Sequence, residues 1–134
     1  MSAEFYTYSF EKLEVWQLAR IFKKEMYLMT QGFPKEEQYG YISQIRRASS
    51  SITVNLAEGS GRASNTDKAN FTNISISSAL EVIDHLIGCF DLGYISEESY
   101  IESRQQLDII ISKLNALYKY QLNQEKSLKL KMKQ

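Results

Sequence analysis

Residues 74–90 read ISISSALEVIDHLIGCF, and this stretch decides the fold class. Large apolar side chains recur in it at alternating steps of four and three residues, the spacing of one face of an α-helix. They are Ile76, Leu80, Ile83, Ile87 and Phe90. A second stripe, Ala79, Val82 and Leu86, lies beside the first. We predict a helix over about residues 65–92 whose first stripe is a core seam.

The ends of this helix carry their own signals. Ser64 precedes it and Asp67 follows three residues later, a pattern that predicts a capping box. Gly93 comes directly after its last apolar residue and predicts the stop. Ser96 then predicts the N-cap of a further helix with an acidic first turn.

Three other segments share the helical period: about residues 11–29, about residues 34–58, and the chain after Ser96. The expected seam of the first segment is Leu13, Trp16, Ala19, Phe22, Met26 and Met29. That of the second is Ile42, Ile45, Ser49, Ile52 and Leu56, and that of the last is Leu107, Ile111, Leu114 and Tyr118. Short breaks separate the segments. We expect Gly32 in the left-handed conformation, Pro34 in the first turn of the second helix, and a second break at residues 59–61.

Four long helices with short connections pack best as an all-α, antiparallel, up-down-up-down four-helix bundle. We assign residues 1–122 to this bundle and residues 123–134 to a basic C-terminal tail. The last helix is expected to fade after Tyr120, and the tail either extends it or is disordered. One proline and six glycines in 134 residues argue against a turn-rich all-β fold.

Charge and cysteine usage limit the partners. Residues 1–118 hold 11 basic and 15 acidic residues, a balance of −4, whereas residues 119–134 hold five lysines and one glutamate, a balance of +4. An acidic body is unusual for a strong nucleic-acid binder. The single cysteine, Cys89, lies in an apolar run, which predicts a buried thiol and suits a reducing cytoplasm. No apolar run reaches the roughly 20 residues that span a bilayer, so we expect no membrane partner.

Catalytic signatures are missing from the sequence. It holds no nucleophile elbow, P-loop, HExxH or paired CxxC motif. Its one histidine, His85, has Glu81 four residues before it, which predicts a minor structural pair within one helix. We therefore expect a non-enzymatic protein with no catalytic residue, cofactor or metal.

A polar stripe beside the seam of the second helix holds the candidate interaction residues. They are Arg46, Arg47, Asn55, Glu58 and Arg62. Polar groups beside a seam cost stability unless they are paired. Three interpretations are open: ion pairs of the arginines with a neighbouring helix or subunit, contacts with nucleic-acid phosphates, or a solvated face. From the residues alone we favour the first.

Several of these segments together resemble a known family. They are FEKLEVWQLA at residues 10–19, FPKEEQYG at 33–40, SQIRRA at 43–48, NLAEGSGR at 55–62 and LGYIS at 92–96. The pattern, over about residues 9–120, resembles the four-helix-bundle proteins encoded by intervening sequences of 23S ribosomal RNA genes. Members often have a proline near the position of Thr53, which this chain lacks.

The resemblance implies a four-helix bundle and a barrel-like homopentamer. It also implies kinship with the accessory variability protein of diversity-generating retroelements, a strongly basic protein that binds nucleic acid and a reverse transcriptase. We therefore expect a homo-oligomeric scaffold or interaction protein that binds itself and a protein or RNA partner. The alternative is an accessory protein that binds RNA or DNA through a basic surface built by the oligomer.

Overall fold

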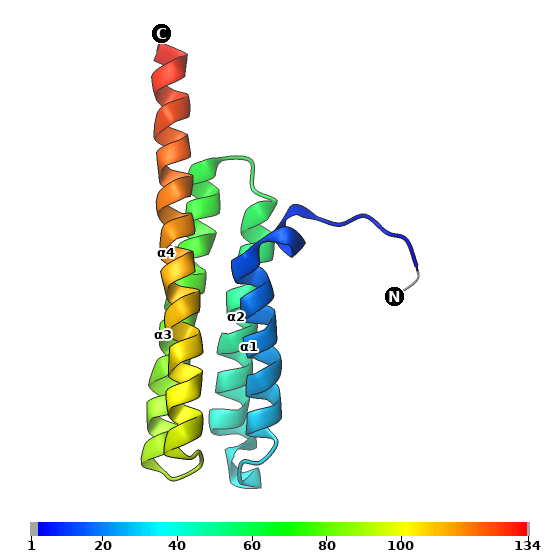
Figure 1. The fold of residues 1–134 in the computed structure, drawn as a ribbon, viewed down its shortest axis with the longest axis vertical. Helices are drawn as coiled ribbons and strands as arrows, with labels where there is room; N and C mark the ends of the chain where they lie inside the picture. Colours follow the sequence, from blue (N-terminus) through cyan, green and yellow to red (C-terminus); the bar gives the residue numbers. More distant parts are fainter. Residues whose placement is uncertain (1–2, 134) are drawn as a thin grey trace.

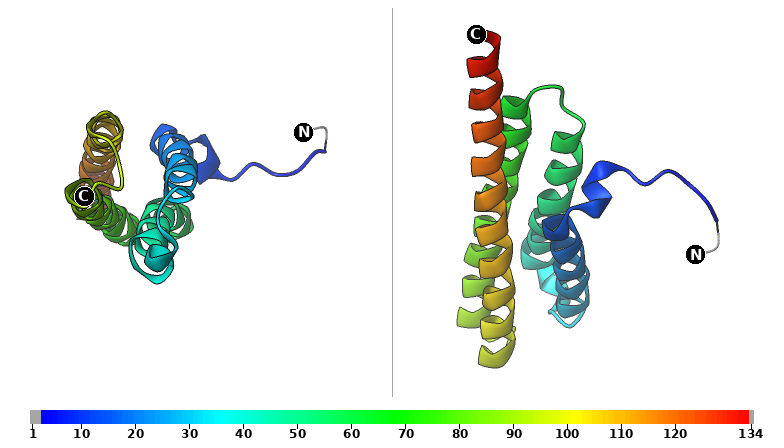
Figure 2. Two further views of the ribbon diagram at one scale, coloured as in Figure 1. Left: turned by 90° about the horizontal axis from the view of Figure 1, so that it is seen from below. Right: turned by 45° about the horizontal axis from the view of Figure 1, so that its top comes forward.

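The computed structural model describes residues 3–133, and four α-helices dominate it. They are α1 (Glu14–Thr30), α2 (Ser43–Ser60), α3 (Asn65–Asp91) and α4 (Glu97–Lys133). Each helix runs opposite to the one before it (Figure 1), and seen end-on the four stand at the corners of a quadrilateral (Figure 2). The prediction of an all-α four-helix bundle is confirmed.

The first helix begins later than predicted. A short 3-10 helix, η1 (Ser9–Lys12), comes first, and Leu13 then adopts an extended conformation with φ −70° and ψ 123°. Because this residue breaks the helical hydrogen-bond ladder, α1 starts at Glu14 and not at residue 11. The expected left-handed Gly32 is also wrong, because among the described residues only Gly93 has a positive φ, of 75°.

The segment before α2 departs most from the predicted helix over residues 34–58. Pro34 is extended, with ψ 145°, and two short irregular turns follow it: η2 (Lys35–Glu37) and η3 (Gln38–Ile42). Gly40 lies outside the helical region at φ −104° and ψ −116°. A side chain at Gly40 would collide with the Glu37 carboxylate, which accepts a hydrogen bond from the backbone N–H of Tyr41. Regular helix therefore begins only at Ser43.

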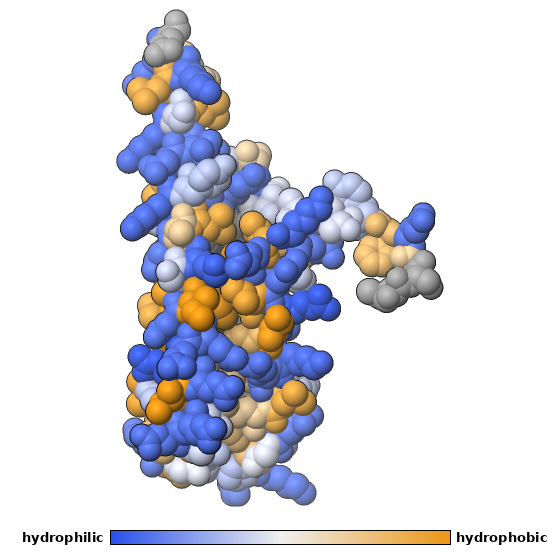
Figure 3. Space-filling view, viewed as in Figure 1, coloured by the Kyte–Doolittle hydropathy of each residue, from blue (hydrophilic) through white to orange (hydrophobic). Residues whose placement is uncertain are grey.

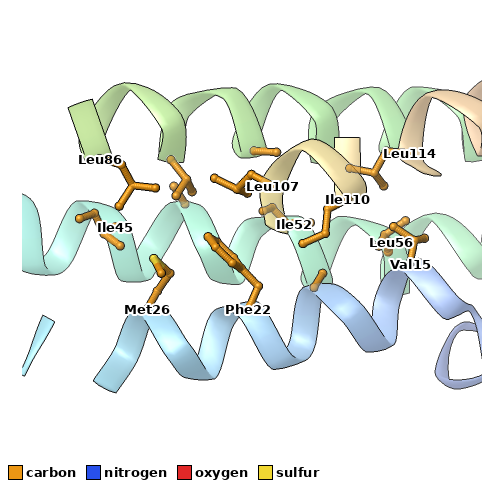
Figure 4. Packing of buried hydrophobic residues seen from close by; sticks show 14 of the residues in the cluster. Val15, Phe22, Met26, Ile45, Ile52, Leu56, Leu86, Leu107, Ile110 and Leu114 are labelled. Carbon is orange, nitrogen blue, oxygen red and sulfur yellow. The ribbon is translucent and has the colours of Figure 1, made fainter. Parts of the chain in front are cut away.

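Apolar side chains from all four helices form one core (Figure 4). Its largest fully buried members are Phe22 and Met26 of α1, Ile45 and Ile52 of α2, Leu86 of α3, and Leu107, Ile110 and Leu114 of α4. Burying each such side chain contributes about 1.5–3 kcal/mol. The predicted seam of α2 is confirmed, and in α4 Ile110 takes the buried place expected of Ile111.

In α3 the second stripe, and not the first, is the fully buried one. The small stripe, Ala79, Val82 and Leu86, is fully buried together with Cys89, whereas Leu80 is 54% and Ile87 40% exposed. The predicted core seam is therefore wrong for these larger residues. At one point α2 approaches α3 closely, where the hydroxyl of Ser75 donates to the carbonyl oxygen of Ile52 at 2.9 Å. Ser75 and Ala79 are small enough for this approach, whereas Val82 and Leu86 of the buried stripe fill the core further along the helix.

The last helix extends well past Tyr120. α4 has 37 residues, and its C-terminal part rises beyond the other three helices (Figure 1). Of the two alternatives for the tail, the helical one is therefore found up to Lys133. Leu, Lys, Gln and Met favour helix, which explains the extension. Within residues 3–133 neither α4 nor any other helix is both long enough and apolar enough to cross a membrane.

The close approach of α2 and α3 yields a test at Gly59. A Cβ atom there would lie 2.7 Å from the Cβ of Phe71, so Gly59→Ala should cost about 1–3 kcal/mol through overpacking, partly offset by about 1 kcal/mol of helix propensity. Gly61→Ala is the matched control, because its Cβ would lie 3.6 Å from the carbonyl oxygen of Glu58. Urea unfolding should give a lower free energy of unfolding for Gly59→Ala than for wild type, and an equal or higher one for Gly61→Ala. Equal stability of the two variants would contradict the close approach.

Candidate functional site

Arg46 joins α2 to the C-terminal end of α1. Its Nε donates to the hydroxyl of Thr30 at 2.9 Å, its Nη2 donates to the carbonyl oxygen of Tyr27 at 3.3 Å, and its guanidinium lies 3.7 Å from the centre of the Tyr27 ring. The last carbonyls of a helix lack partners within it and attract cations. Arg46 therefore fixes the first helix against the second.

Arg47, the next residue, contacts α3, the helix on the other side of α2. Its Nη2 pairs with the carboxylate of Glu81 on α3 and donates to the side-chain oxygen of Gln44 at 2.8 Å. The Nε2 of His85 lies 3.0 Å from the same Glu81 oxygen. Partial burial raises the pKa of the Glu81 carboxyl, but the hydrogen bonds from His85 and Arg47 outweigh it, so its pKa lies below the ordinary 4.5. The ion pair expected between helices is present.

An aromatic cluster continues this polar network toward the end of the bundle. The ring of Tyr41 lies over Gly88, where any side chain would overlap it, and meets the rings of His85 and Tyr94 edge-on at 6.0 Å and 6.4 Å. The hydroxyl of Tyr94 donates to Glu37 at 2.9 Å, which raises the pKa of Tyr94. Burial likewise raises the pKa of Tyr41.

The chemistry available to this cluster is limited. Burial, with the nearby Glu37 carboxylate, raises the pKa of the Cys89 thiol to about 12, so at neutral pH the thiol is protonated and a poor nucleophile. The adjoining groove holds about 200 Å³ and is lined partly by Glu37, Tyr41 and His85. No group of three or more potential metal ligands occurs within residues 3–133. The contacts of this cluster join α2 and α3 to the segments that flank them.

The remaining candidates do not join this network. Asn55 donates to the carbonyl oxygen of Ser51 at 2.8 Å, and the Ser51 hydroxyl meets that of Ser78 on α3 at 2.8 Å. Arg62 lies 3.6 Å from Asp67 at the turn between α2 and α3. Glu58 is exposed and takes part in no ion pair of the described chain. The five candidate residues are thus spread along α2 and do not form one site.

Comparison with known proteins agrees with this architecture. The family model described as 23S rRNA-intervening sequence protein matches residues 11–116, most of the bundle. The chain belongs to the 23S rRNA-intervening sequence protein family. This family match spans the Arg46 and Arg47 contacts with both neighbouring helices and ends within α4. The extended residues before η1 and the projecting end of α4 lie outside it.

A solved structure from Bacteroides thetaiotaomicron has a similar fold. It is a protein with unknown function from the S23 ribosomal protein family, with 23% sequence identity and a TM-score of 0.71. The similarity covers 78% of this chain and 98% of that chain. At this identity the likeness shows the shared fold alone. A search of curated proteins finds no match.

Sequence reasoning found one half of the polar network and missed the other. The pairing of His85 with Glu81 was expected from their spacing within one helix. The roles of Glu37, Tyr41 and Tyr94 were not expected, because their contacts join segments far apart in the chain. The one available signal was Gly88, a glycine inside a helix, which often marks a close approach.

The lowered pKa of Glu81 predicts a pH-dependent contribution to stability. When folding lowers the pKa of a carboxyl, the group stabilises the protein at pH values above its pKa in the unfolded chain. This stabilisation is lost as the pH falls through its pKa in the folded protein. Glu81→Gln should therefore lower the melting temperature at pH 7, by an amount equivalent to about 1 kcal/mol or less for a partly exposed pair. The difference from wild type should shrink as the pH is lowered through the folded-state pKa of the Glu81 carboxyl.

Glu58→Gln on the neighbouring helix is the control for this experiment, because it removes an exposed carboxylate without breaking an ion pair of the described chain. Melting curves followed by circular dichroism supply the measurement. A Glu81→Gln difference that stayed constant between neutral and acidic pH would refute the assignment.

Proposed function

We propose that this protein is a non-enzymatic interaction protein that associates with further copies of itself and presents the assembly to a macromolecular partner. The observation that carries the proposal is the apolar row along the outside of α3. We call it the α3 row; its members are Ile76, Leu80, Ile83, Ile87 and Phe90.

The α3 row has the pattern of a helix seam but lacks a complete partner in the single chain. Ile76 and Ile83 touch the core at its edge, while Leu80 and Ile87 remain exposed. Phe90 stacks on Tyr100 of α4 at 5.1 Å, so the row follows the seam between α3 and α4. A heptad row of this kind normally packs against another chain segment, and contiguous exposed apolar surface commonly marks an interface.

A second apolar surface lies between α1 and α4, the adjacent helices with the least contact. Figure 3 shows apolar side chains gathered there, and a cleft of about 90 Å³ is lined partly by Leu18, Ile21 and Ile109. Two separate apolar surfaces on different flanks favour contacts with two neighbours. Such contacts close into a ring when the rotation between copies permits. A homopentamer, implied by the family resemblance, is one such ring.

The proposal predicts the mass in solution. Size-exclusion chromatography with light scattering should give a multiple of 15.5 kDa at micromolar concentration. The association should persist in high salt, because apolar burial is not screened by ions. A strictly monomeric species under these conditions would refute self-association as the basis of function.

A second candidate function is nucleic-acid binding, which the basic end of α4 favours. Four lysines lie on the part of the helix that projects beyond the bundle: Lys126, Lys129, Lys131 and Lys133. Lysines on an exposed helix contact phosphates without reading sequence. In an oligomer several such ends act together, so that weak single contacts combine into avidity.

Lysine-to-glutamine changes at these four positions test the second candidate. If the projecting helix binds phosphates, the variant should lose affinity for structured RNA and duplex DNA, and the salt dependence of binding should become shallower by about 0.9 per lost duplex contact. The matched control changes four lysines of the body that form no ion pair within residues 3–133: Lys12, Lys24, Lys35 and Lys68. Equal losses in both variants would exclude a specific role for the projecting helix.

A further inference from the structure

The chain begins with an extended arm that stands away from its own bundle (Figures 1 and 2). We use "arm" for residues 3–8, all of them exposed. Its three aromatic side chains, Phe5, Tyr6 and Tyr8, are between 60% and 75% exposed. Aromatic side chains carry much of the energy of protein interfaces and are costly to leave in water.

The fold fixes the base of the arm. The backbone N–H of Tyr8 donates to the Glu11 carboxylate at 2.8 Å, and the side chain of Gln17 donates to the carbonyl oxygen of Glu11 at 2.9 Å. The ring of Phe10 meets that of Trp16 edge-on at 5.1 Å. These contacts hold η1 on α1, so the direction in which the arm leaves the bundle is set by structure.

The arm has one charged side chain, and two of its three aromatic residues lie on the same side as that charge. Side chains alternate along an extended chain, which puts Glu4, Tyr6 and Tyr8 on the same side. The rings of Tyr6 and Tyr8 accordingly lie 4.9 Å apart. Glu4 is the only charged side chain of the arm. A segment with this chemistry fits an apolar surface that contains one unpaired cation.

The α3 row has such a cation beside it. Arg104 of α4 donates from Nη1 to the hydroxyl of Tyr100 at 2.7 Å, and Tyr100 is the residue that stacks on Phe90 of the row. The Nε of Arg104 is buried without a hydrogen-bond partner, and Arg104 forms no ion pair within residues 3–133. A half-buried cation without a carboxylate is unfavourable, so the site favours an incoming acidic group.

We propose that the arm of one copy lies on the α3 row of a second copy, with the paired rings of Tyr6 and Tyr8 between Leu80 and Ile87 and the Glu4 carboxylate paired with Arg104. This inference rests on the self-association proposed above and names its contact.

The dimensions of the two surfaces agree. Six extended residues span about 20 Å, and the helical distance from Ile76 to Phe90 is about 21 Å. The arm leaves the bundle beside α1, whereas α3 stands diagonally opposite, so the arm points away from its own row (Figures 1 and 2). Donor and acceptor surfaces on different sides of one chain make a head-to-tail contact, which closes into a ring when the rotation between copies permits. The arm also lies outside the residues that match the family.

A complementation experiment with full-length chains tests the contact. The arm variant is Tyr6→Ser with Tyr8→Ser, and the row variant is Leu80→Gln with Ile87→Gln. Each alone should weaken association about tenfold or more. In a mixture, the row variant supplies an intact arm and the arm variant supplies an intact row. The two chains should therefore form a heterodimer of twice 15.5 kDa, or 31.0 kDa.

Matched controls exist for both variants. Tyr39→Ser changes an 87% exposed tyrosine far from the arm, and Ile74→Gln changes a 46% exposed isoleucine on another face of α3. Both should keep the wild-type mass. Far-UV circular dichroism spectra of all four variants should match wild type, since every change is at an exposed side chain. The melting temperatures of the arm and row variants should fall, because dissociation removes the stability that association supplies.

The outcomes separate this inference from the proposed function. If wild type is oligomeric but the arm and row variants keep its mass, or if the mixture stays monomeric, the arm contact is wrong and self-association stands on another surface. If the wild-type protein is monomeric, both self-association and the arm contact are wrong. As a second readout, Glu4→Arg and Arg104→Glu should each weaken association, and the chain carrying both changes should recover it.

Discussion

The close approach of α2 and α3 is the constraint on which the rest of the structure depends. Gly59 packs on Phe71, and the Ser75 hydroxyl reaches the backbone of Ile52 at 2.9 Å. The small residues Ser75 and Ala79 permit this approach, and they are buried together with Val82 and Leu86 of the same helix. With this stripe turned inward, the adjoining apolar residues, Leu80 and Ile87 among them, lie on the flank. One packing requirement thus produces both the core of the bundle and the apolar α3 row outside it.

The two adjacent arginines of α2 make this arrangement specific. Successive residues of a helix point about 100° apart, so neighbours in sequence face different partners. Arg46 closes the C-terminal end of α1, and Arg47 pairs with Glu81 on α3. Their side chains are thereby committed to contacts within the chain. A surface for partners is better sought among groups that the single chain leaves exposed, such as Leu80 and Ile87.

Local signals in the sequence predicted the local structure well. The hydroxyl of Ser64 caps α3 by accepting from the N–H of Asp67 at 3.1 Å, and Gly93 ends the same region in the left-handed conformation. Periodicity alone could not choose between the two stripes of α3, because that choice depends on how close α2 lies. The turns before α2 were missed because no periodic pattern marks them: Gly40 is non-helical, and the backbone N–H of Tyr41 donates to the Glu37 carboxylate. The sequence predicted that an arginine at this position pairs with a neighbouring helix. It could not identify Glu81 as the partner of Arg47, because that depends on how α2 and α3 pack.

The uneven charge of the chain connects the two proposed functions. Residues 1–118 carry a balance of −4 and residues 119–134 a balance of +4, and four of the five lysines of the second range, Lys126, Lys129, Lys131 and Lys133, lie on the projecting end of α4. In a single chain four or five lysines form a weak electrostatic target. Cyclic symmetry points every copy in the same direction along the ring axis, so head-to-tail association would gather all the basic ends at one face and the acidic bodies behind them. Such a face attracts phosphates far more strongly than one helix end, because the field of several charges adds and binding becomes multivalent. Self-association would therefore precede nucleic-acid binding, and the arm contact would control both.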